Sequence, residues 1–174
     1  MRTKIVLPLL FATVLLGCLP LRRPGETVLN PKGVPPQILG YYAEKEIRPG
    51  RIWKVFLKIW DADCDMSYII TDIWQPGVGP YPVSFTPVAV AGCDIVVGYL
   101  SLPTPMDANL VGDRLEVKIA VRDEQGNHSE SLKLPLLFAW NAKEELPAEW
   151  HKAAAHSLGR INVALKSPES VGNR

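Results

Sequence analysis

The sequence has few residues of the kinds that metal enzymes use, with three histidines and three cysteines among 174 residues. It contains neither the H-E-x-x-H nor the C-x-x-C spacing of zinc sites. It also lacks the G-x-S-x-G turn of many hydrolases and a glycine-rich phosphate loop that ends in lysine. These absences argue against zinc, phosphoryl-transfer and α/β-hydrolase chemistry, while a Ser-His-Asp triad assembled from distant positions stays open.

A strong charge of one sign is also missing. The chain carries 19 basic and 18 acidic residues, for a formal net charge of +1. It shows no basic patch of the kind that nucleic-acid-binding proteins use, so we expect no nucleic acid among its partners. The apolar run near the N-terminus, residues 5–16, is shorter than the roughly 20 residues that a transmembrane helix needs.

The first 18 residues have the layout of a signal peptide. Arg2 and Lys4 precede the apolar run, which ends in Leu15-Leu16-Gly17-Cys18. That ending resembles the lipobox of bacterial lipoproteins, although Leu16 is bulkier than the small residue usual at its position. The resemblance implies loss of residues 1–17, a diacylglycerol on Cys18 and acylation, for example with palmitate, of the new N-terminus. A plain secretory signal and a cytosolic core helix are the alternatives.

A lipid-modified Cys18 places the protein in a bacterial cell envelope, held by acyl chains that contribute about 0.8 kcal/mol per buried CH₂. Leu19 follows the cysteine, where aspartate would favour retention at the inner membrane of some diderm bacteria. We therefore expect an outer-membrane destination, facing the periplasm or the exterior. Residues 18–36 contain five prolines and predict an extended tether between the lipid and the domain.

The central part of the chain predicts short strands. The 16 prolines and 13 glycines favour many turns over long helices. Apolar residues occupy every second position in the clearest strands, residues 51–60 and 114–123. The other predicted strands, which bring the number to about seven, are residues 37–49, 66–74, 83–90, 94–102 and 128–138.

A different pattern follows these strands. Residues 145–158 predict a short helix, with Pro147 in its first turn and an alanine run at 153–155. After it, alternating Ile161, Val163 and Leu165 predict a final strand. We expect one domain over residues 37–166, which includes this helix and strand as an extension, and a loose tail over residues 167–174.

Two turn motifs lead to a family resemblance. Asp61-Ala62-Asp63-Cys64-Asp65-Met66 follows one clear strand, and V-R-D-E-Q-G-N-H-S, residues 121–129, closes another. With the alternating strands, these motifs resemble a bacterial immunoglobulin-like domain of about 100 residues. The resemblance implies an all-β, immunoglobulin-like sandwich and says little about function, because such sandwiches serve many functions.

Cys64 and Cys93 remain as a pair once Cys18 is lipidated. In an oxidising compartment they predict a disulfide, and two buried free thiols are the alternative. If residues 51–60 and 94–102 pair antiparallel, as strands B and E of the sandwich, the two cysteines lie at neighbouring strand ends. The bridge then closes a loop of about 30 residues and contributes on the order of 3–4 kcal/mol.

Acidic residues gather in the loops expected at one end of the sandwich. Carboxylates are preferred calcium ligands, so this end is a candidate calcium site. The alternative is that the aspartates cap turns by accepting backbone N–H groups. An EF-hand is rejected, because Met66 stands where that loop requires glycine. The candidate ligands are Asp61, Asp63, Asp65, Asp94 and Asp123, and no other cofactor is expected.

Aromatic residues form the second candidate site. Trp60, Trp74, Tyr81 and Trp140 are candidates for a glycan- or peptide-binding surface. The alternative is that they fill the core, as we expect of Trp53. The whole pattern predicts a non-enzymatic, lipid-anchored envelope protein that binds another envelope protein, through an edge strand for example. A carbohydrate- or calcium-dependent module is the alternative, followed by a small hydrolase, and no catalytic residue is assigned.

Overall fold

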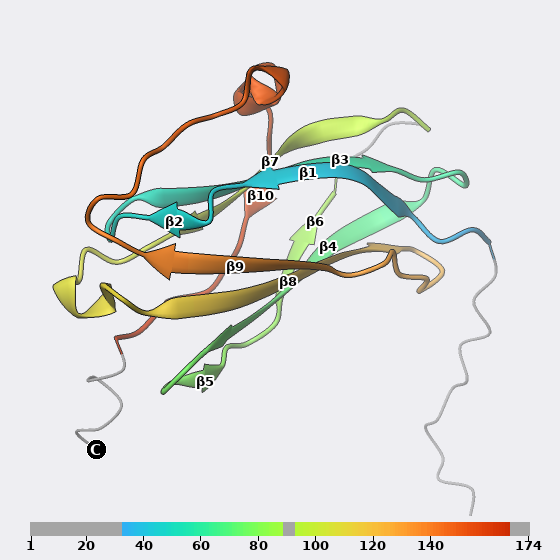
Figure 1. Cartoon of the computed structure of the whole chain (residues 1–174). Helices are drawn as coiled ribbons and strands as arrows, with labels where there is room; N and C mark the ends of the chain where they lie inside the picture. Colours follow the sequence, from blue (N-terminus) through green and yellow to red (C-terminus); the bar gives the residue numbers. More distant parts are fainter. Residues whose placement is uncertain (1–32, 89–92, 168–174) are drawn as a thin grey trace, which may run out of the picture.

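The computed structural model describes residues 33–88 and 93–167. The predicted signal, the lipidation site Cys18, the tether up to residue 32 and residues 168–174 of the tail lie outside the described residues. The described part forms ten strands and three short 3-10 turns (Figure 1). The strands are β1 (Gln37–Ala43), β2 (Glu46–Ile47), β3 (Ile52–Trp60), β4 (Met66–Gln75), β5 (Gly79–Pro80), β6 (Ser84–Pro87), β7 (Val96–Pro103), β8 (Arg114–Asp123), β9 (Leu132–Phe138) and β10 (Ser157–Arg160). The 3-10 turns are η1 (Ala108–Leu110), η2 (Ala148–Trp150) and η3 (Ala153–Ala155).

The strands build two sheets that pack face to face, which confirms the predicted all-β sandwich (Figure 1). The four-stranded sheet has the order β1-β3-β7-β10. The six-stranded sheet has the order β2-β9-β8-β4-β5, and β6 also pairs with β4. Each of the seven predicted strands has a counterpart here. Residues 37–47 serve both sheets, because β1 pairs with β3 and β2 pairs with β9.

The core lies between the sheets and follows the alternation of the sequence. One face of β3 and one face of β8 turn inward, and their apolar side chains are buried. The buried indole of Trp53 keeps its hydrogen bond, because Nε1 donates to the backbone oxygen of Glu44 at 2.8 Å. The inward-facing residues of these strands are Trp53, Val55, Leu57, Ile59, Leu115, Val117, Ile119 and Val121.

The predicted helix over residues 145–158 is wrong. The segment instead forms η2 and η3 and then enters β10. A helix this short is stable only when packing against the rest of the protein supports it. Here the packing of two single residues, and not that of a continuous helical face, fixes the backbone of the segment. Trp150 packs on Phe56 of the four-stranded sheet, with ring centroids 6.0 Å apart, and Ala153 is buried beside it. These contacts hold the segment as a cover over the outer face of that sheet.

The final strand lies earlier than predicted. β10 pairs in parallel with β7, whereas residues 161–167 belong to no strand. Ile161 and Leu165 of that segment are nevertheless buried in the core, as their alternation predicted. The backbone N–H of Asn162 donates to Ser84 Oγ at 2.9 Å. The segment therefore connects the edge of the four-stranded sheet to β6 of the other sheet through side chains.

Candidate functional site

The predicted disulfide is confirmed. Cys64 and Cys93 are bonded, with their Cα atoms 4.5 Å apart. β3 and β7 pair antiparallel up to Ile59 and Val96, so the end of one strand lies beside the start of the other. Cys64 has a φ of 64°, a left-handed conformation that usually favours glycine. The bridge therefore fixes a turn whose backbone is unusual for cysteine.

The aspartates that follow β3 act as local caps. Asp61 Oδ2 accepts the backbone N–H of Asp65 at 3.0 Å, and Asp63 Oδ2 accepts that of Val34 at 2.6 Å. Asp65 Oδ2 accepts the side-chain amide of Gln125 at 3.1 Å. The loop after β3 is thereby tied both to the start of the described chain and to the hairpin between β8 and β9.

The five predicted calcium ligands do not form one site. Both carboxylate oxygens of Asp123 accept hydrogen bonds from Asn127, at 2.7 and 2.6 Å, and Asp94 is exposed. Within residues 33–88 and 93–167, no group of three acidic, histidine or cysteine side chains could hold a metal ion. The aspartates of the loops after β3 and β8 thus match the turn-capping alternative.

Two carboxyls of this loop are unusual in their environment. Asp61 is 1% exposed, and the Oδ1 atoms of Asp61 and Asp65 are buried without a hydrogen-bond partner. Burial raises the pKa of Asp61, and the neighbouring carboxyl of Asp65 raises it further. Asp61 therefore holds its proton more readily than an exposed aspartate does.

The four predicted aromatic residues do not share one surface. Trp74 and Tyr81 line the same groove on the six-stranded sheet. Trp60 is half-buried at the end of β3, in the other sheet, and Trp140 is 55% exposed beyond the end of β9. The prediction of a single aromatic surface is therefore wrong, and only its Trp74–Tyr81 half is a candidate site.

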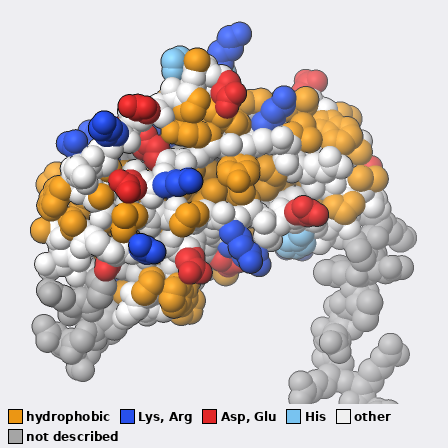
Figure 2. All heavy atoms as spheres, in the orientation of Figure 1, with side chains coloured by type: hydrophobic (Ala, Val, Ile, Leu, Met, Phe, Trp, Pro, Cys, Tyr) orange, Lys and Arg blue, Asp and Glu red, His pale blue; other side chains and the backbone are white. Residues whose placement is uncertain are grey.

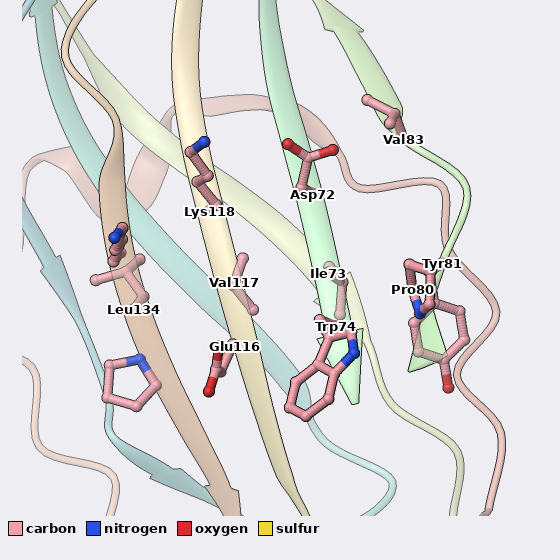
Figure 3. Close-up of a pocket in the computed structure, with 12 residues that line it drawn as sticks. Asp72, Ile73, Trp74, Pro80, Tyr81, Val83, Glu116, Val117, Lys118 and Leu134 are labelled. Carbon is pink, nitrogen blue, oxygen red and sulfur yellow. The ribbon is translucent and has the colours of Figure 1, made fainter. Parts of the chain in front are cut away.

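The groove lies on the outer face of the six-stranded sheet and has a volume of about 590 Å³ (Figure 3). We call it the Trp74 groove. Its floor is formed by β4, β8 and β9, and its rim by the chain from Pro80 to Val83. The outward-facing side chains that line it include Asp72, Trp74, Glu116, Lys118, Lys133 and Pro135.

The rim of the Trp74 groove is held by a polar network around the buried Gln75. Tyr81 donates its hydroxyl hydrogen to Gln75 Oε1 at 2.6 Å and accepts the backbone N–H of Lys166 at 2.9 Å. The side-chain amide of Gln75 donates to Asp113 at 3.0 Å and to the Lys166 carbonyl oxygen at 3.2 Å. Burial raises the pKa of Tyr81, which keeps the phenol protonated. The network fixes Tyr81 beside the groove.

This face carries further apolar residues that were not among the predicted site residues. Tyr68 and Phe85 are 39% and 50% exposed, and their rings meet edge to face with centroids 6.2 Å apart. Val83, beside them, is also exposed. The alternation of β4 was a usable signal, because Tyr68 and Trp74 are six positions apart and so lie on one face.

The edge of the other sheet is a second candidate surface. β1 is the terminal strand of the four-stranded sheet, and its sequence, QILGYYA, contains no charged residue. Leu39 and Tyr41 are 46% and 52% exposed. Figure 2 shows hydrophobic side chains gathered on the surface that β1 and its neighbours present.

Comparisons with known proteins give little more. No protein-family model and no curated protein matches the chain. Among solved structures, the chain resembles the PKD domain of an M14-like peptidase from a Thermoplasmatales archaeon, at 13% identity and a TM-score of 0.38. That match covers 62% of this chain and 98% of the other. In the described residues, no helix is long and apolar enough to cross a membrane.

Proposed function

We propose that this chain is a lipid-anchored protein of the bacterial cell envelope, without enzymatic activity, that binds another envelope protein through β1. The lipobox-like ending at Cys18 supports the anchor, and the proline-rich tether leads to the domain. The observation that carries the proposed binding mode is the uncharged, apolar edge of β1.

Edge strands are normally protected against pairing with other chains by shortness, charge, proline or β-bulges. The other edges of this sandwich follow that rule. β2 and β5 have two residues each, β6 and β10 have four, and β9 carries Pro135. β1 has seven residues, without charge or proline, and its ladder with β3 shifts register once, between Ile38 and Gly40. Such an edge suits an extended segment of a partner, which adds as a further strand and gains main-chain hydrogen bonds.

The position of β1 supports a partner near the membrane. Residues 33–36, the last of the predicted tether, lead directly into β1, and the N–H of Val34 donates to Asp63 Oδ2 at 2.6 Å. The proposed lipidated Cys18 and the proposed binding strand are therefore separated only by residues 19–36. A partner bound at β1 lies within reach of the same membrane.

The test is crosslinked co-purification of the full-length, tagged protein from native membranes. We expect one recurrent partner protein, which is lost in the double variant Leu39→Lys/Tyr41→Lys. The matched control is Met106→Lys, because Met106 is 86% exposed and lies outside β1. Loss of the partner in both variants, or in neither, would contradict binding through β1.

A further inference from the structure

The Trp74 groove carries a binding surface separate from β1. Trp74 is 43% exposed on the outer face of β4 and stands opposite Pro80 in the ladder between β4 and β5. Figure 3 shows its indole between Glu116 on one side and Pro80 and Tyr81 on the other. A large aromatic ring held in such a place offers a flat apolar platform, while its N–H remains able to donate.

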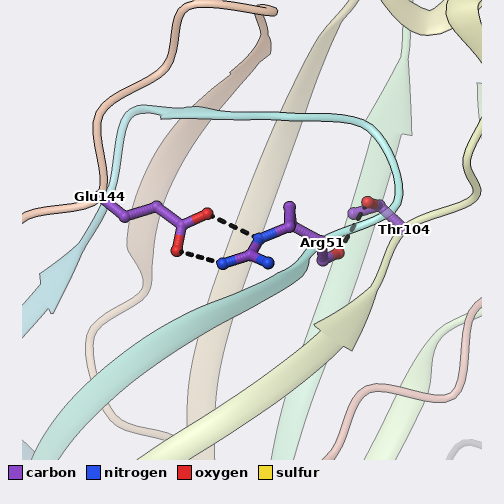
Figure 4. A network of polar contacts seen from close by, with 3 residues as sticks. All are labelled: Arg51, Thr104 and Glu144. Carbon is purple, nitrogen blue, oxygen red and sulfur yellow. Dashed lines mark hydrogen bonds and ion pairs between the residues drawn. The ribbon is translucent and has the colours of Figure 1, made fainter.

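Four charged side chains surround this platform. Asp72 lies opposite Lys118 in the ladder, and Lys118 lies opposite Lys133. Glu116 lies opposite Trp74. All four are exposed. The ion pair found in the described part of the chain, Arg51–Glu144 at 2.9 Å, involves none of them (Figure 4). The groove thus presents two acids and two bases that are free to bind a ligand.

These charges decide between kinds of occupant. An acyl chain or an apolar helix would bury the charged groups without partners, which is costly. A small anion would face Asp72 and Glu116 and would not use the indole. A polypeptide strand finds no free backbone on the floor, because β4 is paired with β8 on one side and with β5 and β6 on the other.

A sugar can satisfy the charged groups and use the indole at the same time, and it needs no free strand edge. Its hydroxyl groups both donate and accept, so they can bind carboxylates and ammonium groups together. The C–H face of a sugar ring is apolar and can stack on the indole. Because the two acids and the two bases cancel in charge, a neutral sugar is favoured over an acidic or a basic one. We infer that the Trp74 groove binds a neutral oligosaccharide.

The length of the apolar surface indicates a chain of sugars. Tyr68 and Trp74 lie six residues apart on the same face of β4, which corresponds to about 20 Å. Val83 and Phe85 are exposed beside this line. The hydrogen bonds of Tyr81 fix the rim before any ligand arrives, and a preformed site loses less entropy on binding.

The test is isothermal titration of the purified full-length chain with cellohexaose and with a hexamer of N-acetylglucosamine. We expect at least one of them to bind, and Trp74→Ala to weaken that binding at least tenfold. Trp140→Ala is the matched control, since Trp140 is an exposed tryptophan outside the groove, and should change affinity less than twofold. Glu116→Gln combined with Lys118→Gln should weaken binding several-fold while leaving the platform intact.

Three results would overturn the inference. One is that neither hexasaccharide binds at millimolar concentration. Another is that Trp140→Ala weakens binding as much as Trp74→Ala. The third is that a photocrosslinking residue at position 74 captures the same protein partner as β1. The titration contains no protein partner, and Leu39→Lys/Tyr41→Lys should leave it unchanged, so its failure is distinct from a failure of the proposed function.

Discussion

Tyr81 and Gln75 are joined by a hydrogen bond of 2.6 Å that fastens the rim of the Trp74 groove to the sheet beneath it. Gln75 is fully buried, and the same Tyr81 oxygen also accepts the backbone N–H of Lys166. One hydroxyl thus connects β4, the rim and the C-terminal segment. Its removal leaves the buried Oε1 of Gln75 and the backbone N–H of Lys166 without this partner.

Tyr81→Phe is therefore expected to lower the free energy of unfolding by about 1–3 kcal/mol. Urea unfolding measures this change. Tyr41→Phe is the control, because Tyr41 is 52% exposed and its hydroxyl does not join this network. An equal effect of the two substitutions would show that the rim network contributes nothing to stability.

The Cys64–Cys93 bridge gives a second prediction. Cys64→Ala should lower the free energy of unfolding by roughly 3–4 kcal/mol in the chain-entropy model. It should also leave Cys93 able to react with a thiol reagent under native conditions. The double variant Cys64→Ala/Cys93→Ala should be similarly destabilised but unreactive at these positions. Reaction of both thiols in the unreduced wild-type protein would contradict the bridge.

Asp61 predicts an unusual pH dependence. Burial and the Asp65 carboxyl raise the pKa of Asp61 in the folded state. The stability linked to this group is therefore fully present below the unfolded pKa and is lost as the pH rises through the folded pKa. Asp61→Asn removes this loss, so the variant should melt a few degrees above the wild type at pH 7.

The difference in melting temperature between Asp61→Asn and the wild type should shrink towards pH 3. At that pH Asp61 of the wild type is protonated and, like asparagine, carries no charge. Thermal unfolding between pH 3 and pH 8 measures the difference, with Asp72→Asn, at an exposed position, as the control. A difference that is constant over this range, or a less stable variant at pH 7, is incompatible with a raised pKa.

The lipid anchor gives a prediction about location. Cys18→Ser should move the protein from the membrane fraction to the soluble fraction and abolish labelling by radioactive palmitate. Cys64→Ala serves as the control, since it removes a cysteine of the domain and should stay in the membrane fraction. Unchanged membrane retention and labelling of Cys18→Ser would contradict a lipid anchor at Cys18.

The parts of the fold that the sequence predicts are those with a simple periodicity. Trp53, Val55, Leu57 and Ile59 alternate, and this pattern places β3 with its buried face. The same principle fails for the alanine run at 153–155, because helix propensity is a weak preference beside the packing of Trp150 on Phe56. Pairing of β10 with β7 then ends the segment where a helix was expected to continue.

The candidate sites were harder to predict, for two physical reasons. An aspartate that caps a turn looks the same in the sequence as one that binds a metal. Only the hydrogen bonds of residues such as Asp61 and Asp123 distinguish the two roles. The Trp74 groove combines residues of β4, β8 and β9 with the rim after β5. Its composition depends on strand order, which the sequence of each strand does not contain.

The most direct test of the proposed function is photocrosslinking from β1 in living cells. A photocrosslinking amino acid at Tyr41 of the full-length chain should capture one envelope protein, whereas the same residue at the exposed position Trp140 should not. The captured peptide is expected to be an extended segment of the partner. Capture of no protein at Tyr41, or of the same set from both positions, would contradict a partner bound at the β1 edge.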